Sequence, residues 1–210
     1  MIDYKTLFVS PFMQNCRIFY NDETLEACVF DPGDNADRIM SELKDRDLTL
    51  KSILITHMHL DHVGGIPALL AVQKVPVYGS AIEDRPLYET LDNQAVAFGL
   101  NKPEIFETEW VKDGQILEPI TGLKFRVITT PGHTPGGVCY YCEEKKLLIS
   151  GDTLFAGSIG RTDFPLGDFD DLIDSIKNKL YKLPPLTDVL SGHGPNSTIA
   201  DEIEGNPYTV

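Results

Sequence analysis

All five histidines of this 210-residue chain follow short apolar runs that are rich in β-branched residues. Such runs are typical of buried strands, and the loops beyond strand ends of an α/β fold converge on one crevice. Two aspartates share this placement, and the full set is His57, His59, Asp61, His62, His133, Asp152 and His193. A glycine immediately precedes His133, Asp152 and His193, which permits tight turns. We therefore expect strand ends to deliver these side chains to one shared site.

The number of these side chains indicates two metal ions rather than one. Zinc takes about four ligands, and a catalytic zinc keeps one position open for water. Seven protein ligands and a bridging hydroxide therefore fit two divalent ions. Zinc is expected first, with iron or manganese as alternatives, because imidazole and carboxylate suit all three. A lone histidine is usually an ordinary hydrogen-bonded residue, but three histidines and an aspartate within residues 57–62 favour a metal site.

Short strand-like runs at residues 7–10, 16–20 and 27–30 predict an antiparallel sheet edge, and apolar spacing predicts helices over residues 35–47 and 169–183. Strands followed by helices, twice over, favour an α/β (α+β) fold with two β-sheets and helices on both outer sides. No repeat or linker interrupts the sequence, so residues 1–210 are expected to form a single domain.

The net charge of −14 disfavours nucleic acid and anionic membrane surfaces as partners. The first residues lack the basic and apolar pattern of an export signal, and the longest apolar stretch, residues 66–72, is too short to span a membrane. A cytoplasmic protein is expected. Cys139 and Cys142 have C-x-x-C spacing, but in a strand they face opposite sides of the sheet, so we expect thiols and no zinc knuckle.

The string Thr-His-Met-His-Leu-Asp-His at residues 56–62, with the later His133, Asp152 and His193, resembles the metallo-β-lactamase superfamily. The resemblance implies the αββα sandwich of that superfamily, in which helices flank two mixed β-sheets. Residues 131–136 and 151–155 are similar to the glyoxalase II group, the hydroxyacylglutathione hydrolases. The chain ends soon after His193, as in the short single-domain bacterial enzymes of that group, and lacks the helical C-terminal domain of the long form.

The resemblance also assigns roles to the seven residues. It implies one metal ion on His57, His59 and His133, a second on Asp61, His62 and His193, and Asp152 as the bridge between them. Asp61 and Asp152 are the expected catalytic residues, with Asp61 orienting the hydroxide as well as binding a metal.

The implied reaction is hydrolysis of a thioester, S-lactoylglutathione, by a metal-bridging hydroxide. The ions lower the pKa of the bound water to roughly 7 and stabilise the oxyanion. Arg161 is the candidate for the substrate's carboxylates, because a guanidinium binds them bidentately; the alternative is an ion pair with Asp163 or Asp168.

Other interpretations of the same residues stay open. Residues 160–164 are also similar to persulfide dioxygenases, which use one iron that His57, His59 or His133 and Asp152 could hold. A non-catalytic metal-binding module is a further alternative. The negative charge disfavours a nuclease, and the lack of an export signal disfavours a β-lactamase. The sequence carries no signal for the oligomeric state.

Overall fold

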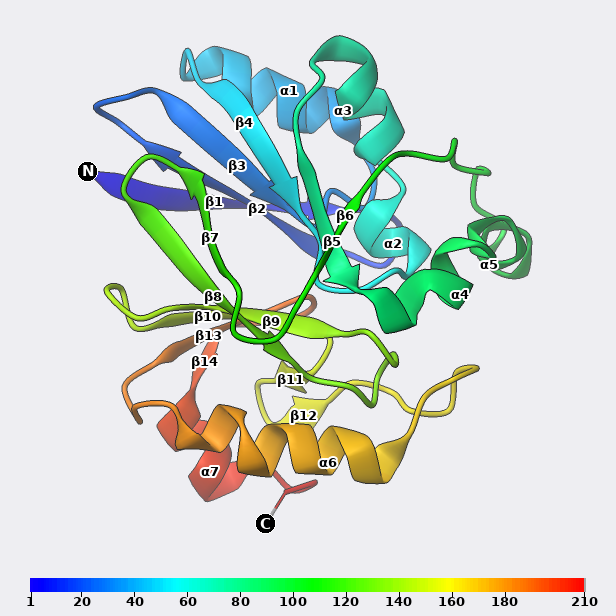
Figure 1. The fold of residues 1–210 in the computed structure, drawn as a ribbon, viewed down its shortest axis with the longest axis vertical. Helices are drawn as coiled ribbons and strands as arrows, with labels where there is room; N and C mark the ends of the chain where they lie inside the picture. The colour runs from blue at the N-terminus through cyan, green and yellow to red at the C-terminus, as the bar shows by residue number, and fades with distance from the viewer. Residues whose placement is uncertain (210) are drawn as a thin grey trace.

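The computed structural model describes residues 1–209, in which two six-stranded sheets pack face to face (Figure 1). The first sheet contains, in spatial order, β1 (Ile2–Val9), β2 (Gln14–Asn21), β3 (Glu26–Phe30), β4 (Thr49–Leu54), β5 (Val77–Ala81) and β6 (Glu109–Val111). The second contains β14 (Ser197–Thr198), β13 (Asp188–Ser191), β10 (Leu147–Gly151), β9 (Val138–Cys142), β8 (Leu123–Thr129) and β7 (Ile116–Ile120). A separate hairpin pairs β11 (Leu154–Phe155) with β12 (Ser158–Ile159).

Both sheets are mixed. Strands β1, β2 and β3 pair antiparallel, as the sequence predicted, whereas β3 to β6 are parallel. In the second sheet β10 and β13 are parallel and the other neighbours antiparallel. Because parallel strands end at the same edge of a sheet, the loops that follow them gather at one place.

Helices cover the outer face of each sheet, as Figure 1 shows. Helices α1 (Ala36–Asp45) and α3 (Ile66–Val72) cover the first sheet, and α6 (Phe169–Asn178) and α7 (Ile199–Gly205) cover the second. The short helices α2 (Leu60–Val63), α4 (Arg85–Tyr88) and α5 (Leu91–Phe98) lie at one end of the sandwich. The predicted fold, two mixed sheets flanked by helices, is confirmed.

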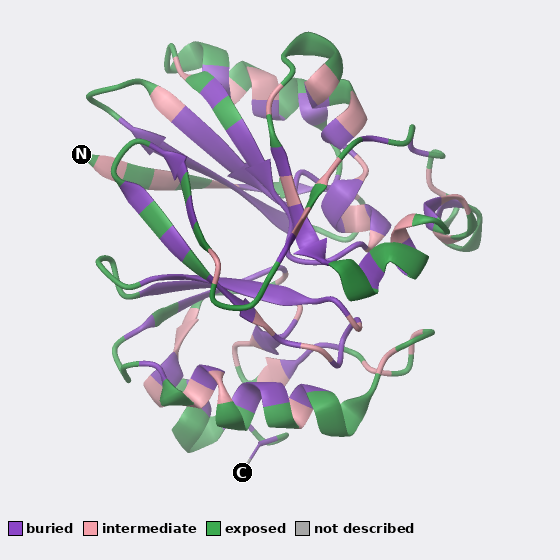
Figure 2. Ribbon diagram, in the orientation of Figure 1, coloured by how far each residue is buried: buried purple, intermediate pink, exposed green. Residues whose placement is uncertain are grey.

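Three layers of buried apolar side chains hold these elements together: one between the sheets and one beneath the helices on each outer face. Figure 2 shows that most of the buried residues lie on the strands. Between the sheets, Phe19, Phe30, Phe125 and Tyr140 pack edge to face, with centroids 5.1 Å apart for Phe30 and Phe125. Each fully buried aromatic side chain contributes about 1.5–3 kcal/mol of transfer free energy.

The element boundaries differ most from the sequence prediction at two places, the start of β1 and the end of α6. Strand β1 begins at Ile2 rather than at residue 7, because its first half alternates exposed and half-buried positions and lacks a continuous apolar run. Helix α6 begins at Phe169 as predicted but ends at Asn178, and a 3₁₀ turn over Leu180–Lys182 replaces its last turn. Helix α1 lies within the predicted residues 35–47.

The predicted orientation of Cys139 and Cys142 is confirmed. Cys139 packs in the layer under α6, whereas Cys142 packs in the layer between the sheets, so the two side chains face opposite sides of β9. All four cysteines are buried free thiols. No helix within residues 1–209 is long and apolar enough to cross a membrane.

Candidate metal centre

The seven predicted residues come together from four loops that follow strand ends. His57 and His59 lie after β4, and Asp61 and His62 follow on α2. The other three come from the second sheet: His133 lies after β8, Asp152 after β10 and His193 after β13. None of the seven lies away from the cluster.

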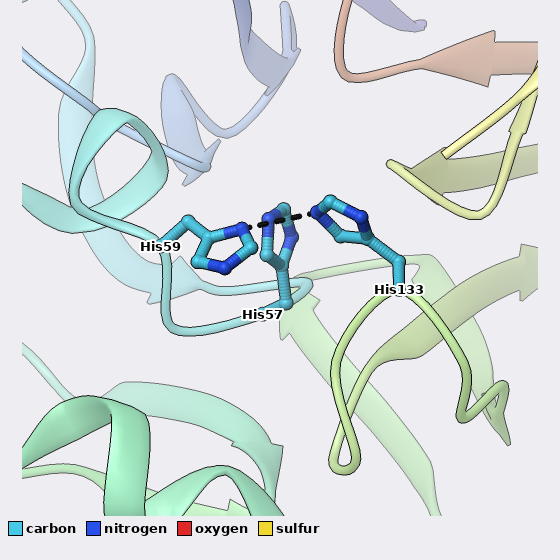
Figure 3. Close-up of side chains that lie close together, drawn as sticks. All are labelled: His57, His59 and His133. Atoms are coloured by element: carbon cyan, nitrogen blue, oxygen red, sulfur yellow. Dashed lines mark hydrogen bonds between the residues drawn. The ribbon is translucent and has the colours of Figure 1, made fainter. Parts of the chain in front are cut away.

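The first group consists of His57, His59 and His133. One nitrogen from each ring lies within 4.8 Å of the others. Nδ1 of His59 is 3.0 Å from Nε2 of His133. Figure 3 shows the three rings turned toward one another from two loops, with the close pair of nitrogens dashed. Two imidazole nitrogens this close and facing each other are arranged as ligands of one ion would be.

The second group consists of Asp61, His62 and His193, whose ligand atoms also lie within 4.8 Å of one another. Nε2 of His193 is 3.3 Å from Oδ2 of Asp61, and Nε2 of His62 is 3.9 Å from the same oxygen. This group therefore presents one carboxylate and two imidazoles, a donor set that suits zinc, iron or manganese.

Asp152 lies between the two groups. Its Oδ1 is 3.4 Å from Nε2 of His62 in the second group, and its Oδ2 is 3.7 Å from Nε2 of His133 in the first. Oδ2 is also 3.6 Å from Nε2 of His193. One carboxylate thus faces both groups, which is the position that a bridging ligand requires.

Three buried atoms at the centre of the cluster have no hydrogen-bond partner: Nε2 of His57, Nε2 of His62 and Oδ1 of Asp152. An unpartnered buried polar group costs about 1–3 kcal/mol. All three belong to predicted ligands, and a divalent cation would satisfy each of them. The residues present therefore fit metal ions.

The opposite ring nitrogens are held by neighbours, which fixes the orientation of each ring. Nδ1 of His57 lies 3.0 Å from Oγ1 of Thr56, and Nδ1 of His62 lies 3.0 Å from Oδ2 of Asp31. Nδ1 of His133 lies 2.7 Å from the carbonyl oxygen of Arg161, and Nδ1 of His193 lies 3.2 Å from the carbonyl oxygen of Phe12.

Asp31 contacts the cluster, and the sequence did not point to it. Its two carboxylate oxygens accept hydrogen bonds from the backbone N–H and the Oγ1 hydroxyl of Thr56, both at 2.7 Å. The second oxygen also contacts His62. Asp31 lies in an Asp-Pro-Gly sequence that is typical of a turn, so only its tertiary contacts show this role.

Glycines allow the loops to approach the cluster. A β-carbon at Gly192 would lie 2.2 Å from Oδ1 of Asp152 and 2.7 Å from Cε1 of His62. Gly151 has φ +49° and packs against Thr56, where a β-carbon would lie 2.5 Å from the hydroxyl. Both positions require glycine because no side chain fits there.

Burial sets the protonation of His57 and His59 in the first group. It lowers the pKa of His57 well below the ordinary value and that of His59 to about 3. Neutral imidazoles have the free lone pair that a metal needs. Burial opposes the charge on His62 as well, but Asp152 and Asp61 outweigh it and raise the pKa of His62 well above its ordinary value.

Comparisons with known proteins agree with this geometry. Residues 11–193 match the sequence profile of the metallo-beta-lactamase superfamily. The chain belongs to this superfamily. A relative from Haemophilus influenzae, hydroxyacylglutathione hydrolase GloC, is 42% identical over 202 residues, which cover 95% of this chain and 94% of the relative.

Two solved structures are also similar to this member of the superfamily. The BLEG-1 B3 metallo-beta-lactamase has a TM-score of 0.90 and 37% identity, and the match covers 99% of both chains. TTHA1623 in a di-iron-bound form has a TM-score of 0.87 and 36% identity, and the match covers 97% of this chain and 99% of that one. The resemblance stated from residues 56–62 is therefore confirmed, and the relative from Haemophilus influenzae extends it to the hydroxyacylglutathione hydrolases.

A pocket of about 770 Å³ opens beside the cluster. Its lining includes His59 and His133 of the first ligand group and Asp61 and His193 of the second. Arg161 also lines the pocket, and its side chain is exposed. Its Nε and Nη2 donate to the two carboxylate oxygens of Asp163 at 2.8 and 2.7 Å. Its guanidinium lies 4.2 Å from the ring centroid of Phe164. The ion pair with Asp163 is thus present, and a substrate contact for Arg161 stays a prediction.

Proposed function

We propose that the chain is a hydrolase that uses two divalent metal ions to cleave a thioester, with S-lactoylglutathione as its substrate. The observation that carries the proposal is the second ligand group, Asp61, His62 and His193, beside the first, with Asp152 in contact with both. A single iron would need only the first group and one carboxylate. The thioester class is supported by the relative named hydroxyacylglutathione hydrolase.

When bound, the ions supply a water whose pKa falls from about 15.7 to roughly 7, and they polarise the carbonyl. His57, His59 and His133 would hold one ion, Asp61, His62 and His193 the other, and Asp152 would bridge them. Zinc is the ion we expect, with iron or manganese as alternatives.

The side chains of the protein have separate tasks in this reaction. Asp61 lines the pocket, and its carboxylate accepts a hydrogen bond from the attacking water and so orients it. Asp152 keeps the two groups at a fixed spacing. The leaving thiolate has a conjugate acid of pKa about 8.5, so no side chain is needed as a general acid.

The test is metal analysis of the purified protein together with two assays on the same sample. We expect two ions per chain and release of glutathione from S-lactoylglutathione. Oxygen uptake on glutathione persulfide without thioester hydrolysis would instead identify a mononuclear iron dioxygenase. Bound metal with neither activity would identify a non-catalytic module.

A further inference from the structure

The pocket beside the cluster has an aromatic wall built from three separate segments. Phe12 lies between β1 and β2, Phe98 ends α5, and Phe164 follows β12. Their rings meet nearly edge to face, with centroids 5.7 Å apart for Phe12 and Phe98 and 6.3 Å apart for Phe98 and Phe164. Phe98 is 48% exposed and Phe12 is 43% exposed. Exposed apolar surface that is gathered around a pocket is typical of a binding site.

The pocket lining has few side chains that could pair with a charged group of a substrate. Among the described residues that line the pocket, Arg161 is the one charged side chain outside the seven-residue cluster, and Asp163 neutralises it. Two of the polar residues in the lining are already engaged: Gln94 accepts from the N–H of Leu60 at 2.9 Å and donates to the carbonyl of Met58 at 3.2 Å, and the Thr90 hydroxyl lies 3.2 Å from the carbonyl of Leu87. The third, Asn93, is exposed to solvent. A carboxylate held against the three phenylalanine rings would lose its water without gaining a charged partner.

We propose that the pocket binds an apolar acyl group larger than lactoyl, of the size of hexanoyl to octanoyl. This inference rests on the proposed thioester hydrolysis and extends it: S-lactoylglutathione is still a substrate of the site, and glutathione thioesters with longer apolar acyl groups are better ones. The reacting carbonyl must lie against the cluster, so either the acyl group or the thiol carrier fills the pocket. A carrier such as glutathione bears two carboxylates, which the apolar wall excludes, and it therefore lies at the mouth near the exposed Arg161.

The first experiment compares glutathione thioesters of one series, lactoyl, acetyl, butyryl, hexanoyl and octanoyl, on the metal-loaded protein. We expect kcat/KM to rise about fourfold for each added methylene up to the length that fills the pocket. This factor corresponds to the ~0.8 kcal/mol of a buried methylene. A series in which kcat/KM is flat or falls from acetyl to octanoyl would overturn the inference.

The second experiment removes one of the three phenylalanine rings that form the aromatic wall. Phe98→Ala should lower the ratio of octanoyl to acetyl kcat/KM at least tenfold, because the longer chain loses more apolar contact than the shorter one. Val96→Ala is the matched control, because Val96 lies on the same helix, is 84% exposed and does not line the pocket. An unchanged ratio in Phe98→Ala would overturn the assignment of the pocket.

A binding measurement gives a readout that does not depend on turnover. Octanoate should bind the metal-loaded protein with a more negative heat-capacity change than acetate, because it buries more apolar surface. Phe98→Ala should remove most of that difference, and an equal heat-capacity change for the two acids in the unsubstituted protein would contradict the proposal. If two ions are bound and no thioester is hydrolysed, the proposed function fails together with this inference. A flat series with clear turnover overturns the inference alone.

Discussion

At the scale of single residues, the cluster depends on side chains that bind no metal themselves. The sequence was sufficient to predict that these seven side chains come together, because imidazole and carboxylate groups at close spacing after strands are typical of metal ligands. It was not sufficient for Asp31. The partners of Asp31 lie 25 and 31 residues away, and a carboxylate before Pro-Gly is expected in a turn whatever it contacts.

Replacement of Asp31 tests this supporting role. Asp31→Asn removes one carboxylate oxygen that accepts from Thr56 and faces His62, so the His62 ring loses its fixed orientation. We expect the affinity for the second ion to fall 10- to 100-fold, as is usual for such partners, in a chelator competition assay. Asp34→Asn is the control, because Asp34 lies in the same turn but is exposed. Equal affinity in both variants would exclude the role.

Arg161 can be tested against its neighbour. If it binds a carboxylate of the thiol carrier, it must leave Asp163 to do so. Arg161→Ala should then raise KM for a glutathione thioester about tenfold with kcat unchanged, and Asp163→Ala should lower KM because the guanidinium is free. If KM stays constant in both variants, Arg161 has only the ion pair.

At the scale of elements, the sequence predicted long apolar patterns well and short or half-buried ones poorly. The buried runs before the ligands became β4, β8, β10 and β13. Strand β1 was predicted to begin too late, because an alternating pattern of exposed and half-buried residues in an edge strand resembles a loop. Helices α4 and α5 are four and eight residues long, too short for helical periodicity to stand out. Phe98 of the aromatic wall lies on α5 and was missed for the same reason, whereas Phe12 and Phe164 lie in loops that have no periodicity.

Gly192, in the loop between β13 and β14, allows a test of how closely the backbone approaches the cluster. Gly192→Ala would place a β-carbon 2.2 Å from Oδ1 of Asp152, and the loop must move to make room. We expect a loss of at least tenfold in affinity for the ion between Asp152 and His62. Gly205→Ala should have no effect, because nothing lies within 4 Å of a β-carbon there. Metal titration of both variants compares them, and an unchanged Gly192→Ala would contradict the geometry.

At the scale of the whole molecule, the two sheets must keep a fixed position relative to each other, since each supplies part of the cluster. The hydroxyl of Tyr140, in the second sheet, lies 2.9 Å from the carbonyl oxygen of Ile55, just after β4, and 3.0 Å from that of Gly79, in β5 of the first sheet. Tyr140 is completely buried. The sequence predicts that sheets face each other, but not which hydroxyl ties them, because such contacts join residues 61 to 85 positions apart.

Loss of this link should weaken folding. Tyr140→Phe leaves buried carbonyls without their donor, which costs about 1–3 kcal/mol of unfolding free energy. Urea unfolding of the metal-free protein measures it, with Tyr208→Phe as an exposed control. A stability equal to that of the control would show that the hydroxyl does not hold the sheets together.

The number of ions per chain in the purified, metal-loaded protein tests most directly whether the cluster holds two ions. The unsubstituted protein should hold two, and His193→Ala should hold one, because only Asp61 and His62 would remain of the second group. One ion in the unsubstituted protein, or two in both proteins, would contradict a two-ion centre built on these ligands.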